Sequence, residues 1–117
     1  MNSDSILESI KKLLGITSDY SVFDADIIMH INSVFFVLQQ LGVGPKNGFR
    51  INDAEAVWSD YMPEENPNIE SVKSYIYLRV KMLFDPPLNS AVIESMNRQI
   101  AELEWRLNVE VENHVAV

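Results

Sequence analysis

The chain has 117 residues, no cysteine and a formal net charge of −8. This length suits one domain with one core, and a hydrophobic content of 47% is that of a folded protein. The absence of cysteine excludes disulfides, thiolate metal sites and cysteine nucleophiles. The negative charge disfavours non-specific nucleic-acid binding, which depends on cations.

Two helices are predicted before residue 42. Ser3 or Ser5 can cap the first helix, and Gly15 ends it. The residues Ser21–Asp24 resemble a capping box at the start of the second helix, and Gly42 ends that helix. Their apolar residues recur at helical spacing. These are Ile6, Leu7, Ile10, Leu13 and Leu14 in the first helix, and Ile27, Ile28, Ile31, Val34, Phe35, Leu38 and Leu41 in the second.

The segment from Gly42 to Pro67 reads as a long insert. Its first part is a loop by composition, residues 49–51 suit a short extended piece, and Asn52 or Asp53 can cap a brief helix carrying Val57, Trp58 and Tyr61. Residues 51–72 contain no Lys or Arg. The simplest interpretation of the acids here is a solvated surface; they are Asp53, Glu55, Asp60, Glu64, Glu65 and Glu70.

Asn68 is predicted to cap a fourth helix that is apolar on nearly every side. Asp85-Pro86-Pro87 ends it, because proline in a helix interior is strongly unfavourable and also restricts the residue before it. A helix that is apolar all round has to be covered on all sides. We therefore expect other copies or partners to supply part of the cover for its apolar residues, Ile69, Val72, Tyr75, Ile76, Tyr77, Leu78, Val80, Met82 and Leu83.

Asn89 or Ser90 is predicted to cap the last helix. Its seam packs on the second and fourth helices and consists of Ile93, Met96, Ile100, Leu103 and Leu107. Trp105 falls about 200° from Leu103 around the helix, away from this seam. It therefore belongs either to a second buried face or to an anchor for a partner.

The carboxyl-terminal residues change period. Val109, Val111, Val115 and Val117 alternate with polar or small residues, which is a strand signal, although the chain offers no obvious strand partner. Two interpretations remain open: an arm that adds a strand to a neighbouring protein, or a disordered terminus.

The sequence contains no convincing catalytic, cofactor or metal motif. Gly42, Gly44 and Gly48 follow a helix and lack the Lys-Ser/Thr pair of a phosphate loop, and neither His30 nor His114 has a metal-site neighbourhood. No apolar run approaches the roughly 20 residues that span a bilayer, and the first residues lack signal-peptide features. We therefore expect a soluble protein that is not an enzyme.

Residues 73–87 and 99–108 resemble small head-tail connector proteins of long-tailed bacteriophages, also called adaptor or head-completion proteins. The order of helices resembles that family over most of residues 5–108, and the insert from Gly42 to Pro67 departs from it. The resemblance implies an all-α bundle of four to five helices with a long insert loop. We expect a single helical connector domain over residues 1–108 and an extended arm over residues 109–117.

The resemblance further implies a subunit of a ring, commonly of twelve copies, seated in the virion neck after synthesis in the host cytoplasm. Such a ring joins the portal to the next connector, stopper or tail protein, extends the DNA channel and performs no reaction. In that setting three groups of residues acquire roles. They are the subunit contacts Tyr75, Tyr77, Leu78, Met82 and Trp105; the portal-docking arm Val109, Val111, Val115 and Val117; and the channel-facing acids Asp53, Glu55, Asp60, Glu64 and Glu65.

Two alternatives remain. A tail-completion or stopper protein would differ in whether its ring touches the portal directly. An acidic DNA-mimicking regulatory inhibitor would bind a basic partner, and it predicts a self-sufficient monomer with scattered surface acids and the fourth helix buried internally.

Overall fold

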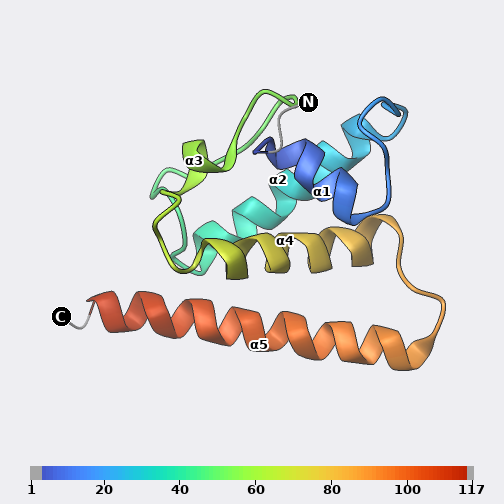
Figure 1. The fold of residues 1–117 in the computed structure, drawn as a ribbon. Helices are drawn as coiled ribbons and strands as arrows, with labels where there is room; N and C mark the ends of the chain where they lie inside the picture. The colour runs from blue at the N-terminus through green and yellow to red at the C-terminus, as the bar shows by residue number, and fades with distance from the viewer. Residues whose placement is uncertain (1–3, 116–117) are drawn as a thin grey trace.

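The computed structural model describes residues 4–115 and shows an all-α fold (Figure 1). No strand occurs within that range, where one isolated bridge joins Ser5 to Val57. The predicted small helical bundle is therefore confirmed. The five helices in this part of the chain are α1 (Ile6–Leu13), α2 (Asp24–Gln40), α3 (Trp58–Tyr61), α4 (Ile69–Phe84) and α5 (Ser90–Val115).

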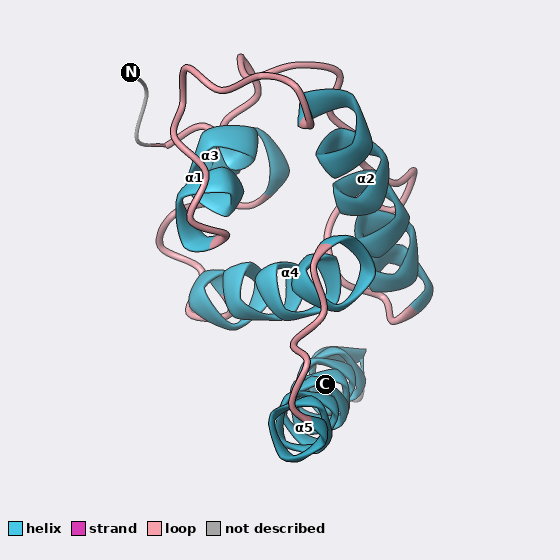
Figure 2. Cartoon of the chain, turned by 90° about the vertical axis from the view of Figure 1, so that its right-hand side faces the viewer, coloured by secondary structure: helices cyan, strands magenta, loops and turns pink. Residues whose placement is uncertain are grey.

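Helix α4 lies at the centre of the bundle, with α1 and α2 on one side and α5 on the other (Figures 1 and 2). The side chains of Val72, Tyr75, Ile76 and Val80 are completely buried within this single chain. The expectation that other copies must cover this helix is therefore wrong for these positions. Three helices of the same chain already surround them.

Helix α1 begins as predicted at Ser5, whereas Ser3 lies outside the described residues. The Ser5 hydroxyl accepts a hydrogen bond from the Glu8 amide at 3.2 Å and donates one to the Ala54 carbonyl at 2.7 Å. The cap thus also fastens the insert to the start of the chain. The predicted apolar stripes of α1 and α2 form the core, although Leu13 is exposed.

Helix α2 does not begin with the predicted capping box. It starts at Asp24, and no side chain caps its first turn. The Asp24 carboxylate instead lies 2.8 Å from the ammonium group of Lys11, which is completely buried and also donates to the Ser18 carbonyl at 3.3 Å. A buried ammonium needs such partners, so an ion pair between α1 and α2 replaces the expected local cap.

The insert is fastened to α2 without forming a strand. The Asn32 amide group exchanges two hydrogen bonds with the backbone of Ile51, at 2.8 and 2.9 Å, where the sequence predicts an extended piece. The Phe49 ring packs against Phe35 and Tyr61, with ring centroids 5.1 and 5.3 Å apart. These contacts hold residues 49–51 beside α2.

The break after α4 is confirmed. Phe84 is the last helical residue, and α5 returns antiparallel to α4 after a turn of five residues (Figure 1). The Asn89 side chain accepts hydrogen bonds from the Ala91 and Val92 amides at 2.8 and 3.3 Å, which identifies Asn89 as the predicted cap of α5.

The predicted strand at the carboxyl end is wrong, because α5 continues as a helix through Val115. Val109 and Val111 belong to this helix. The helix therefore runs without interruption across residue 108, where the sequence predicts the end of the helical domain. Val117 lies outside the described residues. The Val111 side chain packs directly over Gly42. The helix continues into this segment from upstream residues of α5 that are buried. This continuation, together with the contact between Val111 and Gly42, outweighs the preference of valine for strands.

Candidate interaction surfaces

The acids predicted to face a channel all lie in the connection between α2 and α4. Asp53, Glu55, Asp60, Glu64 and Glu65 are exposed, and none forms an ion pair within residues 4–115. Asp60 accepts a hydrogen bond from the Val57 amide at 3.0 Å and so stabilises the start of α3. These residues therefore add negative charge to one part of the surface.

The residues predicted to form subunit contacts on α4 divide into two groups. Tyr75 and Leu78 are buried inside the chain, so they cannot meet another copy in this conformation, whereas Tyr77 and Met82 are partly exposed. A subunit contact at α4 is therefore restricted to the second group. The reason is that α5 covers the side of α4 that α1 and α2 leave open.

A polar clasp of three side chains joins α4 to α5. The Tyr75 hydroxyl donates to the Glu104 carboxylate at 2.7 Å, and the Arg79 guanidinium donates to the same oxygen at 3.0 Å. Burial, and next the hydrogen bond to Glu104, raise the pKa of Tyr75 above its ordinary value. The phenol therefore stays a neutral donor across the physiological range.

Trp105 follows Glu104 of this clasp, but its side chain is 67% exposed and borders a small hollow with Asn68 and Ser71 of α4. Of the two predicted interpretations, a second buried face is therefore excluded in the single chain, and a partner anchor remains. Its neighbours on the outer side of α5, Arg98 and Ala101, are also exposed. Figure 2 shows α5 at one edge of the bundle, next to α4.

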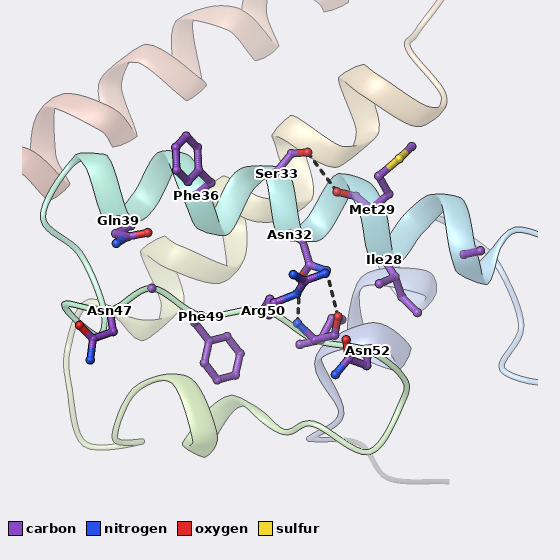
Figure 3. Close-up of a pocket in the computed structure, with 13 residues that line it drawn as sticks. Ile28, Met29, Asn32, Ser33, Phe36, Gln39, Asn47, Phe49, Arg50 and Asn52 are labelled. Atoms are coloured by element: carbon purple, nitrogen blue, oxygen red, sulfur yellow. Dashed lines mark hydrogen bonds between the residues drawn. The ribbon is translucent and has the colours of Figure 1, made fainter.

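An open groove of about 890 Å³ runs along α2, beside residues 47–52 (Figure 3). Met29 and Phe36 are 58% and 60% exposed along it. Neither residue was predicted from the sequence, because both lie outside the core stripe of α2. The sequence could have indicated them, because they lie seven residues apart and therefore on the same side of the helix, away from its core stripe.

The charge of this groove differs from that of the chain as a whole. Arg50 lines it and Lys46 lies on the same loop; both are exposed, and neither forms an ion pair within residues 4–115. None of the described residues that line the groove is acidic. The groove is therefore a locally cationic surface on a chain of net charge −8.

No group of His, Cys, Asp and Glu suited to a metal ion occurs among the described residues. Over the same part of the chain, no helix is both long and apolar enough to cross a membrane. His30 packs its ring on Phe84, with centroids 6.4 Å apart, as a residue at the edge of the core.

The fold is a small helical bundle that leaves several large apolar side chains exposed. The chain belongs to the phage connector protein family, because the model of that family, described as "Phage connector protein", matches residues 6–114. This range extends from the first residue of α1 to the last turn of α5. No curated protein and no solved structure matches the chain. Family membership assigns a structural connector role.

Proposed function

We propose that this chain is a head-tail connector subunit that forms a ring between the portal and the next connector, stopper or tail protein of a phage particle. The observation that carries the proposal is the family match over residues 6–114, which extends from the start of α1 to the last turn of α5. The site of action is the virion neck. The copy number we expect is twelve, as the resemblance to adaptor proteins implies.

The surface of the chain supports an assembly role. Trp105, Met29 and Phe36 are large apolar side chains that remain exposed in the single chain. Such residues stabilise protein interfaces when a partner removes them from water. Tyr77 and Met82 offer a second, smaller contact area on α4.

The acidic part of the connection between α2 and α4, residues 51–68, is proposed to face the DNA channel. Phosphate contacts made by Lys and Arg are what hold DNA to proteins. Residues 51–72 contain no such cation and carry exposed carboxylates. A channel lined in this way would let DNA pass without adhering to it.

The carboxyl end of the chain is proposed to dock on the portal as the end of a helix. The α5 helix extends through Val115, so a strand arm is replaced by a helical one. Val111 already contacts Gly42 in its own chain, which leaves Val109, Val115 and Val117 as the candidates for this contact.

One observation favours a second candidate function. The complete burial of Tyr75 and Ile76 within one chain is what a self-sufficient acidic inhibitor predicts. Such a protein would bind a basic partner stoichiometrically as a monomer. The family match favours the connector.

The decisive experiment mixes the full-length chain with the portal protein of the same phage and records native mass spectra and electron micrographs. A ring seated directly on the portal is expected. Binding to the next neck protein without portal contact would favour the stopper alternative. A chain that stays monomeric and ignores the portal would overturn the proposal, and a one-to-one complex with a basic protein would favour the inhibitor.

A further inference from the structure

We infer that Asn47 is a site of spontaneous deamidation, with water as the co-reactant, and that the turn that carries it restrains the reaction in the folded chain. The sequence contains a single Asn-Gly pair, at residues 47–48. Asparagine deamidates fastest before glycine, because glycine has no side chain to hinder ring closure. The inference is independent of the connector function and concerns the loop that borders the groove along α2.

The reaction balances with groups that the chain and the solvent supply. The backbone nitrogen of Gly48 attacks the side-chain carbonyl carbon of Asn47, and the new C–N bond closes a succinimide ring. The bond from that carbon to the side-chain nitrogen breaks, and this nitrogen leaves as ammonia with the proton that the Gly48 amide gives up. Water then opens the ring at either carbonyl, which leaves aspartate or isoaspartate at position 47.

The Asn47 side chain is free to react. It is exposed and makes no hydrogen bond within residues 4–115. Three other asparagines of this range are exposed, and each is followed by a residue with a side chain; they are Asn52, Asn89 and Asn97. The Asn89 side-chain oxygen also caps α5, and Asn97 lies within α5, where helical hydrogen bonds occupy the backbone amides. Asn47 is therefore the most reactive of the four.

The turn that ends at Gly48 opposes the attack. The Gly48 amide, whose nitrogen is the nucleophile, donates a hydrogen bond to the Pro45 carbonyl at 3.0 Å. The Gln39 side-chain amide donates to the Lys46 carbonyl at 3.1 Å and ties the turn to α2, and Figure 3 shows Gln39 and Asn47 at the same end of the groove. The nucleophile becomes available only when the turn opens. Local opening therefore sets the rate of the reaction.

The same turn requires the glycine that makes the pair reactive. Gly48 has a φ of 85°, which residues with side chains rarely adopt. A Cβ atom at this position would also lie 2.7 Å from the Gln39 side-chain oxygen. Any other residue would strain the turn, so the labile pair is a consequence of the way in which this loop closes against α2.

Deamidation changes the charge of the groove. Asn47 and Arg50 line it, and Lys46 lies on the same loop. Both cations are exposed, and neither forms an ion pair within residues 4–115. A carboxylate at position 47 adds one negative charge between them in the sequence. The product is therefore less cationic at the groove, and anion exchange separates it from the parent chain.

The test follows the charge and mass of the full-length chain at mildly alkaline pH, in water labelled with heavy oxygen. Wild type and variants are incubated in buffer and in concentrated guanidinium chloride, separated by anion exchange and mapped by peptide mass spectrometry, which locates the incorporated oxygen. Asn47→Gln is the control for the site, because glutamine has to close a larger ring, which forms more slowly. Gln40→Ala is the matched control for Gln39→Ala, since Gln40 is exposed and its side chain makes no hydrogen bond within residues 4–115.

We expect heavy oxygen at position 47 before any other asparagine, and no acidic product from Asn47→Gln over the same period. Denaturant should speed the conversion of the wild type by at least about tenfold, because two hydrogen bonds have to open and each corresponds to a factor of about five. Gln39→Ala should speed it about fivefold in the folded chain, because one of these bonds is lost. Gln40→Ala should leave the rate unchanged.

Each part of the inference can fail separately. Conversion at another asparagine first, or no product at position 47 in folded Gln39→Ala, overturns the assignment of the site. Equal rates in buffer and denaturant, or equal rates in Gln39→Ala and Gln40→Ala, overturn the restraint by the turn. None of these results bears on the connector function, which ring formation on the portal tests.

Discussion

Helices α2 and α5 both pack on α4, but they do so by different means. Helix α2 contributes a wide apolar face, in which Ile27, Ile31, Val34 and Leu38 are essentially inaccessible to water. Among the residues of α5 whose side chains the structure describes, only Leu107, at 2%, is buried to a similar degree, and Met96 is 8% exposed. The polar clasp of Tyr75, Arg79 and Glu104 completes the contact between α5 and α4.

This difference means that the surface that stabilises the fold and the surface that is left free lie on different sides of the molecule. The side of α4 that faces α1 and α2 holds most of the buried apolar surface, and burial of such surface is the main stabilising term in folding. Helix α5 is attached along a narrower stripe and keeps its opposite side free (Figure 2). A chain built in this way has one side of a long helix free without any loss to its core.

The largest expected effect contrasts two isoleucines on the two sides of α4. Ile31→Ala empties a fully buried site on α2 and should lower the free energy of unfolding by about 3 kcal/mol. Ile100→Ala on α5 removes a partly exposed side chain and should lower it by about 1 kcal/mol. Urea unfolding followed by circular dichroism measures both. Equal losses would show that α5 belongs to the same core.

The ion pair between α1 and α2 gives the next largest effect. Asp24→Asn removes the carboxylate 2.8 Å from the buried ammonium of Lys11 and leaves only Glu8, at 3.9 Å, as a charged partner. We expect a loss of about 2 kcal/mol, since an unpaired buried charge is costly and Asp24 itself is partly exposed.

Asp85→Asn is the matched control for that prediction. Asp85 pairs with Lys81 at the same distance of 2.8 Å, but its side chain is largely exposed. Its removal should change the free energy of unfolding by less than about 0.5 kcal/mol. Similar losses in the two variants, measured by thermal and urea unfolding, would contradict the special role of burial at Lys11.

The clasp predicts a smaller effect that depends on pH. Tyr75→Phe removes the hydrogen bond to Glu104 and should cost about 1 kcal/mol near neutral pH. Burial raises the pKa of Tyr75 in the folded chain. The neutral phenol therefore stabilises the fold fully below the unfolded pKa of about 10, and this contribution is lost as pH rises above it.

The test compares urea unfolding of the wild type and Tyr75→Phe between pH 7 and pH 11. The wild type should lose stability more steeply above pH 10. Tyr61, whose pKa burial also raises, is present in both proteins and contributes equally. Parallel profiles would show that Tyr75 does not contribute to this dependence.

The helices could be predicted because their signals are local. The caps at Ser5 and Asn89 and the break at Asp85 depend on residues within one turn of the helix end, and the structure places all three as expected. The apolar stripes likewise needed only the 3.6-residue period. Fold class follows directly from such features.

Two local predictions failed, since Asn68 makes no capping hydrogen bond at α4 and α3 begins at Trp58, beyond the predicted caps Asn52 and Asp53. The other errors concern contacts between segments far apart in the sequence. The pairing of Lys11 with Asp24 replaced a local cap, and the packing of Val111 on Gly42 accompanies a helix where alternation predicted a strand. The groove was not predicted because Met29 and Phe36 line it only when residues 47–52 lie beside α2. No local pattern contains that information.

The smallest expected effect on stability concerns the acidic connection, which neither side of α4 covers. Glu64→Lys combined with Glu65→Lys reverses two exposed charges that form no ion pair within residues 4–115, so the free energy of unfolding should change by less than about 0.5 kcal/mol. DNA binding should nevertheless rise, because four units of charge shift toward the phosphates. Retention of assembled rings on a DNA column at increasing salt measures this. Rings of the variant that elute with the wild type would show that these acids face away from the channel.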